Sequence, residues 1–410
     1  MSQDTQDEHE FPWDIGVFDA HCHPTDTMAS IADIPRMKAT TLTVMSTRAD
    51  DQDLVFQSAS NLAKDTDLKQ GDTERILPCF GWHPWFSHQL IDDTTANPNS
   101  DSKEEKENLS EDEVKKAHYS KVLKPPPNDD FISSLPPPKS LSQLLSETRS
   151  RLQAFPHAPV GEVGLDRAFR LPQPWTPEEM DSRNGAMTPG SREGRKLSPH
   201  QVRPEHQKAV LEAQLRLAGE LQRPVSVHSV QAHGGVVEVF KNIWKGHERK
   251  RASRRERKRR GSHAEAHAGS DAEDANVQTT SNGAGAEQEP RPLSFPPRIC
   301  MHSYSGPPEA LSQFLHPSNP STIYFSFSSV INFSHHSDRS VEVIKALPDD
   351  RVLIESDLHI AGKEMDDKLE EVTRQICAIR GWELRQGVKQ LADNWRRFVF
   401  GEAGVERPSA

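Results

Sequence analysis

Two histidines, His21 and His23, stand two positions apart at the end of a short apolar run. In a strand, residues i and i+2 point to the same face, so both rings would face one point. Two converging imidazoles can hold a divalent metal. A chain with 19 histidines also produces such a pair by chance. The metal hypothesis therefore depends on whether further ligand-type residues occur in matching places.

Further histidines and carboxylates follow the later strand candidates. They are His83 after the third candidate, Glu162 in the fourth, His228 after the fifth, His302 after the sixth and Asp357 after the eighth. One buried histidine or aspartate is commonly a hydrogen-bonded core residue. Six strand ends that agree are much harder to attribute to chance. In a barrel these ends meet on one rim, which favours a common site.

The residue types restrict the chemistry of this site. The predicted metal ligands are His21, His23, Glu162, His228, His302 and Asp357. Four imidazoles and two carboxylates suffice for two divalent ions, which we expect to be Mg²⁺, Mn²⁺ or Zn²⁺. A carboxylate from Glu162 could bridge ions ~3.5–4 Å apart, the spacing of two-metal hydrolases. Such a pair lowers the pKa of a bound water and stabilises charge on a phosphoryl or acyl oxygen.

Eight short apolar segments alternate with helical patterns along the chain. The strand candidates are residues 15–20, 41–46, 76–80, 159–163, 224–227, 298–301, 323–327 and 351–354. Their continuous apolar character suits parallel strands that are buried on both faces. The alternation predicts an α/β fold of the (β/α)8, or TIM-barrel, type. A doubly wound open sheet is the alternative, but no Gly-rich dinucleotide fingerprint follows the first candidate.

Three segments interrupt this pattern within the single predicted domain, residues 1–410. Residues 92–139, 167–204 and 246–297 are rich in charge, proline, glycine or serine, which predicts mostly disordered loop insertions. The first two follow strand candidates and should lie on the active-site face of a barrel, whereas the third should lie on the opposite face. A basic run at 250–260 suggests a nuclear import signal, and hence location in nucleus and cytoplasm. A nucleic-acid-binding arm and a solvated helix extension are its alternatives.

Composition sets further limits. No apolar run approaches the ~18 residues of a membrane span, and the acidic start is unlike a secretory signal. Four scattered cysteines form no disulfide framework, which favours an intracellular, reduced protein. The net charge of −11 gives no general attraction to nucleic acid.

The motifs together resemble the TatD family of metal-dependent deoxyribonucleases, which have an amidohydrolase-type barrel. The matching motifs are FDAHCH at 18–23, CFGWHP at 79–84, VGEVGLD at 160–166, PVSVHS at 224–229, CMHSYSG at 300–306, RVLIESD at 351–357 and NWRRFVFG at 394–401. The resemblance implies that His21 and His23 hold one metal and that His228 and His302 belong to the second. It further implies that Glu162 bridges the two metals, that Asp357 lies at the edge that the two metal sites share, and that His83 contacts substrate phosphate.

By this resemblance we expect a phosphodiester hydrolase of the deoxyribonuclease type, with Asp357 and Glu162 as its catalytic residues. DNA or another phosphodiester is the expected substrate. A metal-dependent hydrolase of another ester or amide is the enzymatic alternative. The insertion-rich form also resembles a fungal branch known partly as binding partners of a mitotic ubiquitin-ligase subunit, which implies a protein partner through the insertions.

The chain departs from the family pattern in three places. Val230 stands soon after the strand-five histidine, where relatives carry arginine, and Leu358-His359-Ile360 stands where they usually have Pro-Tyr. The first insertion also brings seven carboxylates, between Asp101 and Glu113, near the expected site. Their charge would repel a polyanion at low salt, which makes long DNA the less certain substrate.

Overall fold

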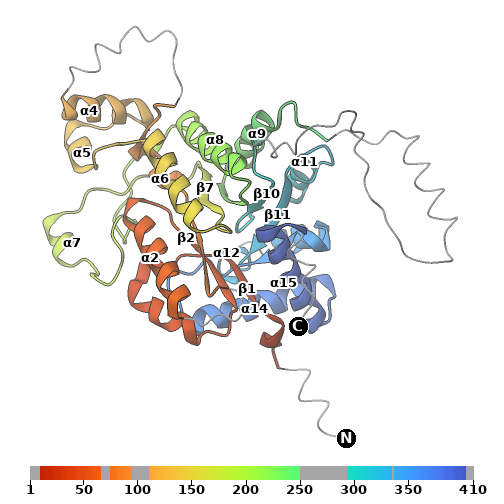
Figure 1. Cartoon of the computed structure of the whole chain (residues 1–410). Helices are drawn as coiled ribbons and strands as arrows, with labels where there is room; N and C mark the ends of the chain where they lie inside the picture. Colours follow the sequence, from red (N-terminus) through yellow and green to blue (C-terminus); the bar gives the residue numbers. More distant parts are fainter. Residues whose placement is uncertain (1–9, 66–73, 95–109, 250–292, 335–336, 403–410) are drawn as a thin grey trace, which may run out of the picture.

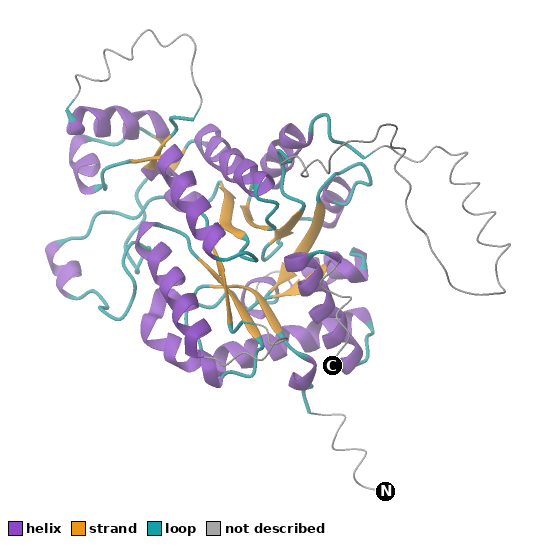
Figure 2. Ribbon diagram, in the orientation of Figure 1, coloured by secondary structure: helices purple, strands orange, loops and turns teal. Residues whose placement is uncertain are grey.

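A computed structural model describes residues 10–65, 74–94, 110–249, 293–334 and 337–402. Eight parallel strands form the centre of the molecule, and helices surround them (Figures 1 and 2). The strands are β1 (Phe18–Cys22), β2 (Thr41–Met45), β3 (Ile76–Cys79), β7 (Val160–Asp166), β9 (Val225–Val230), β10 (Arg298–Met301), β11 (Thr322–Phe327) and β12 (Val352–Ile354). They pair in the orders β1-β2-β3 and β12-β11-β10-β9-β7.

Backbone hydrogen bonds join these two groups of strands at both seams. At one seam Phe80 pairs with Val160, and the Gly161 N–H donates to the Phe80 carbonyl at 3.1 Å. At the other, the Asp357 N–H donates to the His21 carbonyl at 3.0 Å, and the segment after β12 thereby joins β1. The eight strands therefore close into a ring, and the predicted (β/α)8 barrel is confirmed.

Helices follow the strands as the alternating pattern predicts. The main ones are α2 (Ala49–Asp65), α6 (Leu141–Ala154), α8 (Pro204–Glu220), α9 (His233–Trp244), α13 (Ser337–Ala346), α14 (Lys363–Arg380) and α15 (Leu384–Phe400). Shorter ones are η2 (Pro24–Arg36), η3 (Pro84–Gln89), α11 (Leu311–Phe314) and α12 (Ser329–Asn332). The last helix, α15, closes one end of the barrel, where Trp395 stacks on Phe18 with ring centroids 4.4 Å apart.

The strand bounds differ from the prediction at β7 and β9, which each end three residues later, and at β1, which begins at Phe18 and includes Cys22. Residues Trp13–Ile15 form a 3-10 turn, and Gly16 has a φ of 97°, which bends the chain just before the strand. The later end, at Cys22, places His21 inside the strand. Its ring is therefore positioned by the barrel rather than by a loop.

The first two insertions differ from the predicted disorder over much of their length. They contain α4 (Glu111–Val122), α5 (Asp129–Ser134), α7 (Pro177–Asp181) and the short strands β5 (Leu123–Lys124) and β8 (Gln201–Val202). A separate hydrophobic cluster holds them, made of Tyr119, Val122, Leu123, Phe131, Ile132, Leu171 and Val202. The average composition of the insertions conceals these apolar residues, because charged residues and prolines surround them.

The third insertion leaves and re-enters the barrel on the face opposite the ligand residues. Its described end at Arg249 donates from its N–H to the Ser318 carbonyl, in the segment that leads into β11. The basic run 250–260 lies outside the described residues, and so does the rest of 250–292. Among the described residues, no helix is both long and apolar enough to cross a membrane.

All four cysteines are buried and free. Cys22, Cys79 and Cys300 belong to barrel strands, whereas Cys377 lies in α14. Burial raises the pKa of each thiol, so none is a reactive thiolate in the folded protein.

Candidate metal centre

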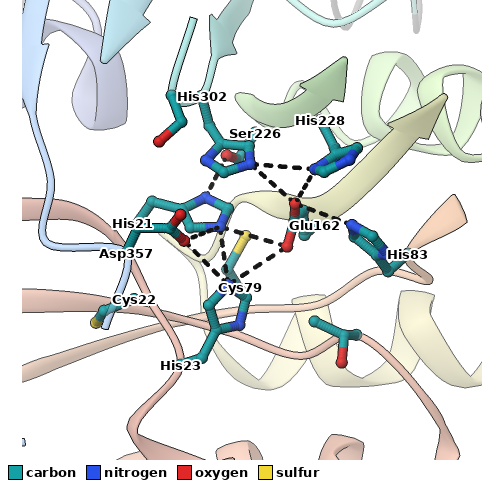
Figure 3. Close-up of polar contacts among 12 residues, drawn as sticks. His21, Cys22, His23, Cys79, His83, Glu162, Ser226, His228, His302 and Asp357 are labelled. Atoms are coloured by element: carbon teal, nitrogen blue, oxygen red, sulfur yellow. Dashed lines mark hydrogen bonds and ion pairs between the residues drawn. The ribbon is translucent and has the colours of Figure 1, made fainter. Parts of the chain in front are cut away.

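The structure brings all six predicted ligand residues together at the C-terminal rim of the barrel (Figure 3). They come from β1, β7 and β9 and from the segments directly after β1, β10 and β12. The histidines and Glu162 are buried, and the side chain of Asp357 is 14 % exposed. The group is thus enclosed by protein and reachable from the side of Asp357.

One set of ligand atoms surrounds Oε2 of Glu162. The Nε2 atoms of His21 and His23 lie 3.1 Å apart, and each is 3.4 Å from this oxygen. Oδ1 of Asp357 is 3.6 Å from Nε2 of His23 and 3.9 Å from that of His21. Zn–N bonds of 2.0–2.1 Å put tetrahedral ligand atoms about 3.3 Å apart. These four residues, the first-ion group, match that spacing closely.

A second set surrounds Oε1 of the same carboxylate. Nδ1 of His228 lies 2.8 Å from it and Nε2 of His302 lies 3.0 Å from it, with 3.3 Å between the two nitrogens. These three residues form the second-ion group. The two oxygens of Glu162 therefore face two separate nitrogen sets, which is the arrangement of a bridging carboxylate.

The remaining nitrogen of each histidine in the second-ion group faces another carboxylate. Nε2 of His228 lies 3.1 Å from Oδ2 of Asp166, and Nδ1 of His302 lies 3.4 Å from Oε1 of Glu355. A carboxylate only accepts, so each of these outer nitrogens carries the proton. The inner nitrogens are then free to bind a metal. Metal-binding histidines usually have this kind of outer partner, so the donor set fits a metal.

The ionisation of the cluster also indicates a need for positive charge. Burial would raise the pKa of Glu162, but His83, His302 and His21 hold it well below its usual range. Burial would likewise lower the pKa of His23, but Asp357 and Glu162 raise it to about 9. Protons on His23, His228 and His302, whose pKa values are raised, would thus offset the carboxylates when no ion is bound. Divalent ions would replace those protons.

His83 differs from the candidate metal ligands in the position of its ring proton. Its Nδ1 accepts a hydrogen bond from the Trp85 N–H at 3.1 Å, and burial lowers its pKa to about 4. The neutral ring therefore carries its proton on Nε2, which lies 3.1 Å from Oε1 of Glu162. His83, Glu162 and His228 lie close enough to be grouped as possible ligands. The protonated Nε2 makes His83 a hydrogen-bond donor at the site instead.

Two outer residues, Asp166 and Glu355, were not predicted to act at the site. Asp166 lies four positions after Glu162 on β7, and the period of a strand places both on one face. That signal was available in the sequence. Glu355 accepts from the Ser303 N–H at 2.8 Å and from the Ser326 hydroxyl, besides facing His302. Its role depends on contacts between strands, which the sequence alone does not show.

Replacing Asp166 with asparagine should weaken metal binding about 10–100-fold, as is usual for outer partners of metal ligands. Oδ2 of Asp166 accepts from Nε2 of His228 and, at 2.6 Å, from Nε1 of Trp85. An amide nitrogen there would donate to His228 and shift its proton to the inner nitrogen. Competition for Zn²⁺ with a chelating dye measures the change. D181N, in the exposed helix α7, is the control, and equal affinity in both variants would contradict the assignment.

The sequence of this chain is similar to those of known proteins. The sequence profile described as "TatD related DNase" matches residues 18–400. The Cut9-interacting protein scn1 of Schizosaccharomyces pombe is 35% identical over 385 residues, which cover 93% of this chain and 98% of that protein. An uncharacterized deoxyribonuclease of Saccharomyces cerevisiae is 24% identical over 400 residues, again 93% of this chain and 98% of the relative.

Among solved structures, an uncharacterized amidohydrolase from Saccharomyces cerevisiae has a similar fold. Its TM-score is 0.51 at 14% identity, over 93% of this chain and 99% of that one. The profile match of 18–400 includes all eight barrel strands and all six candidate ligands. The chain therefore belongs to the TatD-related DNase family.

Proposed function

We propose that this protein is a two-metal phosphodiester hydrolase of the deoxyribonuclease type. The observation that carries the proposal is the position of Glu162, whose two carboxylate oxygens face the two separate histidine pairs. Membership of the TatD-related DNase family supports the choice of phosphodiester over other esters or amides. Four imidazoles among six ligands favour Zn²⁺ or a similar ion over Mg²⁺, which prefers oxygen ligands.

Each residue of the site has a distinct part in the proposed reaction. The two ions, when bound, would activate a water and offset the charge that develops on the phosphoryl group. Asp357 would accept the proton, because its side chain is the most exposed of the six and is ionised at neutral pH. Burial would raise its pKa, but His23, His302 and His21 lower it to about 2. Glu162 holds the two halves of the site at a fixed separation.

His83 should be needed for turnover but not for metal binding, because its Nε2 proton faces the site. We expect His83→Ala to lower kcat by about 10²-fold, the usual effect of losing one preorganised donor. His83→Gln, which keeps a donor, should retain more of the activity. Metal content measured by elemental analysis should stay unchanged in both variants. Loss of bound metal in His83→Ala would make His83 a ligand and contradict this prediction.

The direct test of the proposed function is hydrolysis of labelled single-stranded DNA by the purified protein. It should be run with Mg²⁺, Mn²⁺ and Zn²⁺ in parallel, with a chelated sample as the blank. Methyl p-nitrophenyl phosphate and p-nitrophenyl acetate separate phosphodiester from carboxylic-ester chemistry. Cleavage of the acetate without cleavage of either diester would contradict the proposal.

A second function, binding to a protein partner, is favoured by one comparison. The relative that is 35% identical over 93% of this chain is named as Cut9-interacting. We propose that this chain also binds a protein related to Cut9. The described parts of the first two insertions offer a folded surface for it, on α4, α5 and α7. Shortening residues 110–139 should abolish co-precipitation with that partner, whereas metal content should be unchanged.

A further inference from the structure

The segment after β12 places one histidine beside the metal centre that the proposed function does not use. His359 stacks on His23, with ring centroids 5.1 Å apart and an angle of 17° between the rings. Its side chain is 61 % exposed, whereas no side chain of the six candidate ligands exceeds 14 %. His359 therefore lies at the exposed edge of the first-ion group, beside Asp357.

A buried carboxylate fixes the orientation of this ring. Nδ1 of His359 lies 2.7 Å from Oδ2 of Asp26, and the Asp26 side chain is buried. Because a carboxylate only accepts, Nδ1 is the donor, and the free end of the ring is Nε2. Within the part of the chain that the structure describes, Nε2 has no hydrogen-bond partner.

Asp26 is itself held from two sides. Its Oδ1 accepts from Nη2 of Arg48 at 2.6 Å, and its carbonyl accepts from the Thr188 N–H at 2.9 Å. Arg48 is buried and donates from Nε to the Pro189 carbonyl at 2.8 Å. The insertion 167–204 thus fastens Asp26 and Arg48 to the rim. An imidazole held by so fixed a carboxylate loses little freedom when it makes a further contact.

We propose that His359 is a substrate-binding residue, whose unprotonated Nε2 accepts a hydrogen bond from a sugar hydroxyl of the nucleotide on the first-ion side, and that Asp26 is its positioning residue. The inference rests on the proposed function, because it takes the nucleotide as the ligand. A ring that only packed against the barrel would be buried, whereas most of the His359 side chain is exposed. His359 combines an exposed free nitrogen, a fixed ring and contact with a candidate ligand.

The test measures binding of thymidine 5′-phosphate to the metal-loaded protein by calorimetry. Phenylalanine at 359 keeps a flat ring against His23 but has no nitrogen, whereas glutamine restores a polar end. We expect His359→Phe to weaken binding by up to about tenfold, the effect of one neutral hydrogen bond, and His359→Gln, whose amide oxygen can accept, to recover part of it. Metal content should match the wild type in both. His316→Phe is the control, since His316 is exposed in the segment that leads into β11, away from the site.

Asp26→Asn tests the positioning role through non-additivity. Alone it should weaken binding in the same direction as His359→Phe, but in the His359→Phe background it should change nothing further. Inorganic phosphate as a second probe identifies the contact. Unchanged phosphate binding with weaker nucleotide binding in His359→Phe assigns the contact to the sugar, and weaker phosphate binding would contradict this assignment.

Two other results would overturn the proposal, and they are distinguishable. If the wild type cleaves DNA but His359→Phe binds thymidine 5′-phosphate as tightly as the wild type does, His359 is not a substrate contact and the proposed function stands. If the metal-loaded wild type neither cleaves DNA nor binds the nucleotide, the proposed function fails and this inference fails with it.

Discussion

Glu162→Gln should lose the hydrolytic activity almost completely, by at least ~10³-fold in kcat, because the site loses the one group that both ions would share. Glutamine has nearly the same shape, so the barrel should still fold. The amide offers one oxygen instead of two and carries no charge. Elemental analysis should therefore find less than the wild-type amount of both ions, not of one alone.

Glu238→Gln is a suitable control for this change. Glu238 lies on α9 with its side chain 60 % exposed, paired with Lys208 and away from the metal centre. Its replacement should leave kcat and metal content unaltered. A Glu162→Gln protein that cleaved DNA within a few-fold of the wild type would show that catalysis does not use a bridged pair of ions.

Removal of the ions should lower thermal stability markedly, and this is the second large effect that we expect. An ion present at 100 times its Kd stabilises the folded state by ~2.7 kcal/mol, and two ions contribute about twice that. Scanning calorimetry with and without a chelator should therefore show a shift of several degrees in Tm. The shift should be smaller at low pH, where protons on His23 and the other imidazoles compete with the ions.

The same measurement on Glu162→Gln provides the comparison. Chelation should hardly change its Tm, since the variant binds little metal. An equal shift in both proteins would place the stabilising ions elsewhere in the chain. No shift in the wild type would mean that the cluster binds metal too weakly to affect folding.

The sequence predicts the barrel well, and it also predicts that the candidate ligand residues lie together, for a physical reason. Strands that are buried on both faces must be continuously apolar, so they stand out, and polar residues at their ends have few places to point except the rim. Both signals are local. His21 and Glu162 could therefore be assigned to one site although 141 positions separate them in the sequence.

Contacts between distant segments could not be predicted in this way. Asp26 and His359 are 333 positions apart, and nothing in either local pattern indicates their hydrogen bond. The order within the insertions was missed for a related reason. Phe131 in α5 and Val202 in β8 belong to one hydrophobic cluster but come from different insertions. Neither segment alone has enough apolar residues to predict a fold.

The four buried thiols can be used to measure local opening of the fold. A thiol reagent can modify Cys22, Cys79 or Cys300 only after strands of the barrel separate, whereas Cys377 requires only that α14 lift away. Labelling rates resolved by mass spectrometry would therefore compare how often the barrel strands and the outer helix α14 open, without any introduced probe. Repeating the labelling with metal and with chelator would show how far from the site bound ions reduce local opening.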